Sequence, residues 1–219
     1  MTTTAPETMR DHWWWRPGWD VGRRFYTWHL TFDGQPDVHR FAAAYRELLV
    51  AVDGIDLVPD RWLHLTTQGI GFVGEIPEAD VRTIVEAARE RLAAIPCFDL
   101  VLDAPVVDPE AILVPVRPAA PVHAVRDAVR EAIATVRDVP ERADGFTPHI
   151  SLGYSSATGP TEPFRAALTS TGIPGARARI TRAELIVIHR DNRMYEWESY
   201  ASVPIGTRVR HDETLRSPS

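Results

Sequence analysis

The sequence predicts an α+β fold in which one unit occurs twice. Segments with strand-like alternation and segments with helical spacing follow one another along the 219 residues. The chain can be divided near residues 110–120 into halves with a similar order of elements. Each half contains a helix followed by a strand with the tripeptide histidine–apolar–hydroxyl, His64-Leu65-Thr66 and His149-Ile150-Ser151. Shared element order and a shared tripeptide favour a duplicated unit.

The first half contains two predicted strands, each followed by a predicted helix. Residues 23–32 are rich in aromatic residues and threonine, which favour strands, and residues 37–52 have apolar positions near helical spacing. Residues 61–67 alternate again, and glycines after them predict a loop. Pro77 opens a second helix of about 18 residues. In the first strand, alternation places four large apolar side chains on one face: Tyr26, Trp28, Leu30 and Phe32.

The second half follows the same scheme. A helix is expected after Pro118 and Pro121, where Val122, Val125 and Val129 recur at helical spacing. The other expected elements are strands at 98–107, 111–117 and 146–154, a short helix at 161–171, and strands at 178–189 and 194–203.

One domain is expected to hold all of these elements. We place it at residues 23–206, after an irregular segment at 1–22 and before a polar tail at 207–219 that we expect to be disordered. The first segment contains a cluster of tryptophans, which can pack the segment against the domain or stack on a base or sugar. We favour packing, because tryptophan carries a large apolar area. The cluster consists of Trp13, Trp14, Trp15 and Trp19.

Composition argues against several classes of function. The net charge of −6 argues against binding along a DNA duplex as the main activity. No apolar run approaches the roughly 18–20 residues that a membrane span needs. Cys97 is the single cysteine, in an apolar setting typical of a buried thiol, so no internal disulfide can form. We therefore expect a cytoplasmic, monomeric protein. All 24 basic residues are arginine, so any cationic contact to a phosphate comes from arginine, histidine or backbone N–H groups.

The two tripeptides carry the chemistry. Side chains at i and i+2 of a strand face the same way, so His64 projects with Thr66, and His149 with Ser151, while the apolar residue between them enters the core. An imidazole can move a proton near neutral pH, and a hydroxyl can donate to a phosphate oxygen. Two such units facing one another supply a base, an acid and two phosphate anchors without a metal or a cofactor.

The motifs resemble those of the 2H phosphoesterase, or 2′-5′ RNA ligase-like, superfamily. The resemblance rests on His64-Leu65-Thr66 with Gly71-Phe72-Val73-Gly74, and on Pro148-His149-Ile150-Ser151-Leu152-Gly153. It implies a bilobal, pseudo-twofold fold with two mainly antiparallel sheets, a central cleft and helices outside. It also implies metal-independent action on 2′,3′-cyclic or 2′-5′ phosphodiesters of nucleotides or RNA ends. His64 and His149 are then catalytic, and Thr66 and Ser151 bind the phosphate.

The sequence departs from the family pattern in two places. Four residues, 67–70, lengthen the stretch before Gly71, and Tyr154 stands where many members have a basic residue after the second motif. These departures bear on the substrate. His29-Leu30-Thr31 also fits the tripeptide, but in the family layout the first strand carries no catalytic motif. We expect His29 to contact substrate or to be structural.

Other residues are weaker candidates. Tyr154 can reach a phosphate, stack on a base or pack. Arg61 and Arg190 are the best candidates for cationic phosphate contacts, although for each we favour a solvated surface residue. His12 lies in an irregular segment and is expected to be exposed. Two other functions stay open: a noncatalytic module that binds nucleotides or RNA ends in the same cleft, and a zinc hydrolase that uses three cleft histidines.

Overall fold

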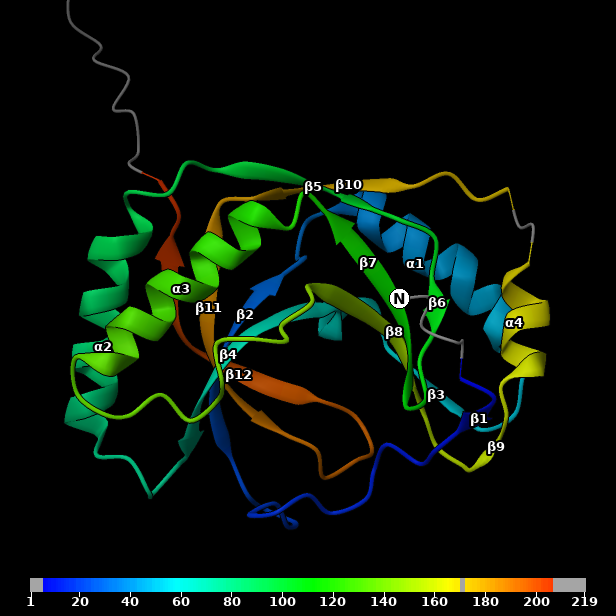
Figure 1. The fold of residues 1–219 in the computed structure, drawn as a ribbon, viewed down its shortest axis with the longest axis horizontal. Helices are drawn as coiled ribbons and strands as arrows, with labels where there is room; N and C mark the ends of the chain where they lie inside the picture. The colour runs from blue at the N-terminus through cyan, green and yellow to red at the C-terminus, as the bar shows by residue number, and fades with distance from the viewer. Residues whose placement is uncertain (1–5, 170–171, 207–219) are drawn as a thin grey trace, which may run out of the picture.

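Two antiparallel sheets organise the computed structural model, which describes residues 6–169 and 172–206 (Figure 1). The first sheet has the strand order β12 (Glu196–Pro204), β11 (Arg182–His189), β2 (Phe25–Thr31) and β4 (His64–Phe72). The second sheet has the order β10 (Ala176–Ile180), β5 (Phe98–Leu102), β7 (Ala111–Arg117), β8 (His149–Ser155) and β3 (Ile55–Leu57). Two short pairings complete the strands: β6 (Val106–Val107) lies beside β7, and β1 (Thr8–Met9) pairs with β9 (Gly159–Pro160).

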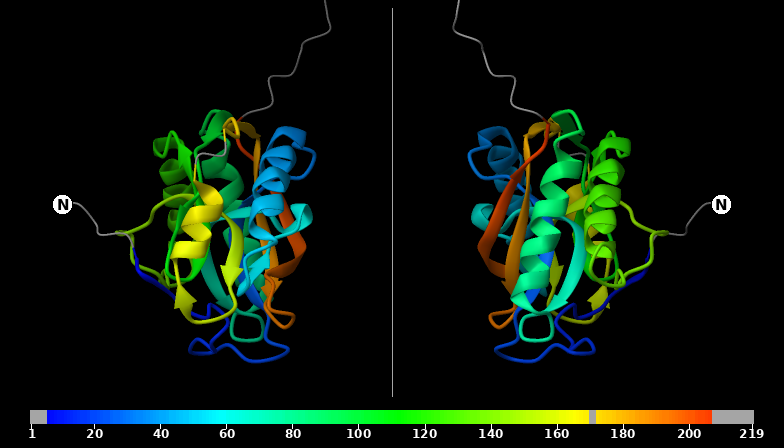
Figure 2. Two further views of the ribbon diagram at one scale, coloured as in Figure 1. Left: turned by 90° about the vertical axis from the view of Figure 1, so that its right-hand side faces the viewer. Right: turned by 90° about the vertical axis from the view of Figure 1, so that its left-hand side faces the viewer.

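Two helices, one from each half of the chain, pack against the sheet that does not contain the strand before them. Helix α1 (Pro36–Leu49) follows β2 of the first sheet but packs against β10, β3 and β8 of the second, beside α4 (Glu162–Leu168). Helix α3 (Ala120–Ala134) follows β7 of the second sheet but packs against β4 of the first, beside α2 (Glu78–Leu92). Figure 2 shows α1 and α3 on opposite sides of the molecule. The expected bilobal α+β fold with a duplicated strand–helix–strand unit is confirmed.

The alternation of side chains along β2 determines which face of the strand enters the core and which faces the other lobe. Trp28 and Leu30 are fully buried in the hydrophobic core, as the alternation predicts. Phe25, Thr27 and His29 lie on the opposite face and line a cavity between the lobes. Burying one large apolar side chain contributes roughly 1.5–3 kcal/mol, so a one-residue slip of this strand would be strongly disfavoured.

The structure differs from the sequence prediction in strand boundaries. Strand β4 starts at His64, after a 3₁₀ turn at Asp60–Trp62, and continues to Phe72 where a loop was expected. Strand β4 stays paired with β2 at Gly69, which has no side chain. A Cβ at this position would lie 2.9 Å from the Phe25 ring. The single strand expected at 178–189 is two strands, β10 and β11, which belong to different sheets.

The sequence predicts that both ends of the chain lie outside the domain. The expected tail at 207–219 lies outside the described residues. At the other end, residues 10–24 form no helix or strand but cross from the second sheet to the first, along the bottom of Figure 1. No helix in the described part of the chain has the length and apolar character to span a membrane.

Candidate active site

The two motif strands meet at one cavity between the lobes. His64 is the first residue of β4 and His149 the first residue of β8, and these two strands contact one another across the lobes. Both histidines line a cavity of about 390 Å³, together with Thr66 and Ser151. This volume is at the lower end of the roughly 300–1,000 Å³ that small-molecule sites occupy.

A larger groove, of about 980 Å³, lies elsewhere between the lobes. Its lining includes no histidine, and carboxylates and guanidinium groups nearly balance there. We therefore assign the candidate site to the histidine cavity. The charged residues of the larger groove are Asp33, Asp37, Asp99, Arg177, Arg179, Arg182 and Glu184.

Both motif histidines are held in the same tautomer. The Nδ1 atom of His64 is 2.8 Å from the carbonyl oxygen of Trp62, and that of His149 is 2.8 Å from the carbonyl oxygen of Thr147. A carbonyl oxygen only accepts hydrogen bonds, so each Nδ1 carries a proton and donates it. In the neutral ring this leaves Nε2 as the nitrogen that can take up a proton from a ligand.

Burial keeps His64 neutral. The pKa of His64 is lowered to about 4, chiefly by burial, while the hydrogen bond to the Trp62 carbonyl raises it and the neighbouring His149 lowers it. The edge of the Trp197 ring packs against the imidazole, with the ring centroids 5.2 Å apart. At neutral pH, His64 therefore has an unprotonated nitrogen available in the cavity.

His29 belongs to the same group of side chains. Its ring stacks on that of His64, with centroids 4.4 Å apart and planes 2° apart. Its Nε2 atom is 3.1 Å from the Thr66 hydroxyl oxygen. Its pKa is held well below the ordinary value, first by burial and then by neighbouring His64. A neutral His29 thus fixes the position of Thr66.

The second motif leads into an aromatic wall. Tyr154 lines the cavity together with Ser151 of the second motif. The ring of His12 stacks on Tyr154 at 4.5 Å, and its Nε2 atom is 2.9 Å from the hydroxyl of Tyr195. The exposed position predicted for His12 is wrong: the residue is buried and lines the cavity, because residues 10–24 fold back over the site.

The two arginines proposed from sequence do not line the cavity. Arg61 is exposed, with its guanidinium over the Trp62 ring and 3.9 Å from Glu196. Arg190 is buried and donates to the carbonyl oxygen of His12 at 2.9 Å, surrounded by the aromatic rings of Trp13, Trp15, Trp19 and Tyr195.

Arg16 lines the cavity instead. The sequence does not single out Arg16, because its segment carries no motif, and its proximity to the tryptophan cluster is the one available signal. That cluster divides between two roles. Trp13 is packed, Trp14 and Trp15 are about half exposed, and Trp19 lines the cavity.

We expect the imidazole of His64 to titrate near pH 4 in the free protein, because burial disfavours the charged ring. A phosphate anion bound in the cavity should raise this midpoint, since a negative charge favours the imidazolium form. Both effects can be followed by NMR of the ring protons, assigned with a His64→Gln variant. A midpoint at the ordinary value of about 6.5, unchanged by phosphate, would contradict the burial of this ring.

The side chains of the described residues do not form a ligand set for the zinc alternative. Within residues 6–169 and 172–206, no group of three histidine, cysteine, aspartate or glutamate side chains is arranged to hold a metal ion.

A duplicated antiparallel α+β fold, with a histidine and a hydroxyl from each lobe in one cavity, defines the class of 2H phosphoesterase-like proteins. The model of the 2′-5′ RNA ligase superfamily matches residues 32–192, and the chain belongs to this family. A comparison with curated proteins finds no match.

Solved structures share the fold. The chain resembles TT0787 of Thermus thermophilus, with a TM-score of 0.60 and 16% identity, over 85% of this chain and 99% of that one. It also resembles E. coli LigT complexed with 3′-AMP, with a TM-score of 0.61 and 14% identity, over 84% of this chain and 99% of that one. At these identities the likeness is one of fold.

Proposed function

We propose that this protein is a metal-independent phosphodiesterase that uses His64 and His149 as its acid–base pair. Its substrates are 2′,3′-cyclic or 2′-5′ phosphodiesters of nucleotides or RNA ends. One observation carries the proposal: two imidazoles from different lobes line one cavity, in the same tautomer, each with a hydroxyl two residues later. Family membership supports it, as do structures of LigT with 3′-AMP and with phosphate.

The chemistry requires two proton transfers. For a cyclic phosphate, one histidine removes a proton from water as the water oxygen bonds to phosphorus. The bond from phosphorus to one ribose oxygen breaks, and the other histidine donates a proton to that oxygen. The products are one ring-opened phosphate monoester and a histidine pair with its protons exchanged, which solvent restores. Each proton-transfer group contributes about 10²–10⁴-fold in rate.

The hydroxyls hold the phosphate between the histidines. Thr66 and Ser151 lie on the cavity side of their strands and can each donate to a nonbridging oxygen. If Nε2 of His29 donates to the Thr66 oxygen, the Thr66 hydroxyl hydrogen is free for the phosphate. His29 is therefore a positioning residue for Thr66.

Product analysis in the presence of EDTA tests this function. The substrates are 2′,3′-cyclic nucleotides, 2′-5′ dinucleotides and ADP-ribose cyclic phosphate. We expect at least one cyclic phosphate to open to a monoester at the same rate with and without the chelator, because the proton transfers come from side chains. Turnover that EDTA abolishes and zinc restores would indicate the metal hydrolase instead. A ligand that binds but persists unchanged would indicate the noncatalytic binding module.

A further inference from the structure

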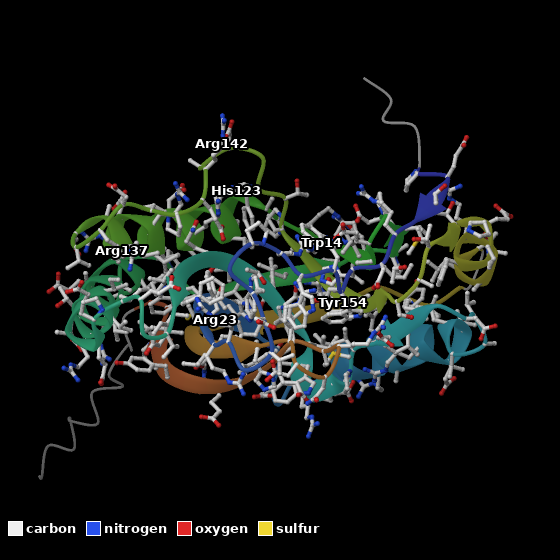
Figure 3. All side chains as sticks on the ribbon, turned by 90° about the horizontal axis from the view of Figure 1, so that it is seen from below. Trp14, Arg23, His123, Arg137, Arg142 and Tyr154 are labelled. Carbon is white, nitrogen blue, oxygen red and sulfur yellow. The ribbon has the colours of Figure 1, made fainter. Side chains whose placement is uncertain are left out.

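The N-terminal segment, residues 10–24, forms one wall of the candidate site. It precedes residues 32–192, which the family model matches. In Figure 1 it crosses below both lobes, and Figure 3 looks onto the face that it crosses, with Trp14 and Tyr154 labelled there. It contributes three residues to the cavity lining: His12, Arg16 and Trp19.

Specific contacts fix this segment to the domain. The indole N–H of Trp13 donates to Asp56 at 2.8 Å, and Trp13 is 9% exposed. Arg190 donates to the carbonyl oxygen of His12, whose ring stacks on Tyr154. The wall is therefore a built part of the site and keeps Arg16 in a defined place.

Arg16 has N–H donors that its contacts with the rest of the protein do not use. One of its terminal nitrogens donates to Glu110 at 2.7 Å, and its guanidinium lies over the Trp14 ring, 5.1 Å from the centroid. Its Nε atom is buried and has no hydrogen-bond partner among the described residues. A guanidinium offers five N–H donors, so Glu110 and Trp14 orient this one without saturating it.

The surroundings of Arg16 favour an anion. Arg190 is buried against the same segment, where it donates to the carbonyl oxygen of His12, and it forms no ion pair within the described part of the chain. Glu110 is the carboxylate nearest to Arg16, and it also lies 3.3 Å from Nδ1 of His12. The partly exposed Arg16 and the buried Arg190 thus both bring permanent positive charge to this wall, where an added negative charge is favourable.

Arg16 and His149 lie toward different ends of strand β8. Arg16 donates to Glu110, which precedes Ala111, and Ala111 pairs with Tyr154, whereas His149 pairs with Pro115. His149 is the first residue of β8, and Tyr154 lies five residues further along, roughly 16 Å in an extended strand. An anion at Arg16 is thus a different group from a phosphate held by the histidines.

We propose that Arg16 binds a second phosphate of the substrate, and that the protein prefers a nucleotide with a phosphate beyond the one being cleaved. The inference rests on the proposed function, because it takes the histidine pair as the position of the reacting phosphate. Tyr154 and Trp19 line the same cavity, and their aromatic rings suit the nucleoside that joins the phosphates.

Paired substrates test this inference. Adenosine 2′,3′-cyclic phosphate and its 5′-phosphorylated form are compared in the native protein and in Arg16→Gln. We expect the native protein to prefer the 5′-phosphorylated substrate. Arg16→Gln should lower kcat/KM for that substrate by about 10- to 100-fold, as loss of a charged hydrogen bond predicts, and lower kcat/KM for the unphosphorylated substrate by a much smaller factor.

Arg10→Gln is the matched control. Arg10 belongs to the same segment and lies 4.0 Å from Glu110, but it is exposed and does not line the cavity. It should keep the native preference. Equal loss in both variants, or a native preference in Arg16→Gln, would overturn the assignment of Arg16.

Binding separates this inference from the proposed function. If neither substrate is turned over, calorimetry with 3′-AMP and adenosine 3′,5′-bisphosphate still measures the second-phosphate contact. Tighter binding of the bisphosphate that Arg16→Gln abolishes supports Arg16 even if the catalytic proposal fails. Equal binding of both nucleotides by the native protein would overturn the role of Arg16 directly.

Discussion

Replacing His64 or His149 by alanine is expected to lower kcat for a cyclic phosphate by about 10²–10⁴-fold, or roughly 3–5 kcal/mol of barrier. Each variant lacks one of the two groups that move protons, while the hydroxyls and the aromatic wall remain to bind substrate. Both side chains line an open cavity, so the fold should survive. Steady-state kinetics with a circular dichroism melt measures both effects.

A double variant and a control sharpen this result. Base and acid act in one transition state, so the double variant should lose far less than the product of the two single losses. His39 lies on α1 and does not line the cavity, so His39→Ala should keep native kcat. Full activity in either motif variant would falsify the proposed catalytic role.

The motif strands could be predicted from sequence because their constraint is local. Alternation alone shows that His64 projects with Thr66 and that Leu65 enters the core, and Leu65 is fully buried in the structure. The same alternation separates Trp28 from His29 on the first strand. The similar tripeptides in the two similar halves of the chain predict that His64 and His149 act together. In the structure both histidines line one cavity.

Other features depend on contacts between distant segments. Arg61 is a candidate because it stands beside the first motif strand, and Arg190 because it stands near the end of a late strand. Position along the chain, however, does not specify where a long side chain ends. Arg190 is enclosed by aromatic rings of the N-terminal segment, and Arg16 reaches the cavity from that same segment. No local pattern indicates that residues 10–24 cross both lobes.

The helical spacing of apolar residues likewise does not show that helices are exchanged between the lobes. An apolar stripe on residues 36–49 shows that the helix is packed, but not on which sheet. Helix α1 covers the second sheet although it follows a strand of the first. One buried side chain, Arg126 of α3, holds the exchanged arrangement together near the site.

Replacing Arg126 by methionine is expected to destabilise the protein by about 2–4 kcal/mol and to lower turnover. Arg126 is 4% exposed and donates to the carbonyl oxygens of Thr67 at 3.0 Å, Arg142 at 2.8 Å and Ala143 at 2.7 Å. It therefore ties the strand of the first motif to the segment that leads into the second. Methionine fills the space, but it leaves the buried Thr67 carbonyl unpaired and that segment without an anchor.

Urea unfolding measures the stability change, and kinetics below the melting transition measures the loss of turnover. Arg126→Lys should fall between the native protein and Arg126→Met, because an ammonium cannot reach three carbonyls in the geometry of a guanidinium. Arg142→Met is the matched control: Arg142 lies in the same segment but is exposed and pairs with Asp144 at the surface, so its loss should leave both quantities unchanged. Native stability in Arg126→Met would mean that the two motifs are held in register by the packing of β4 against β8 alone, without this link.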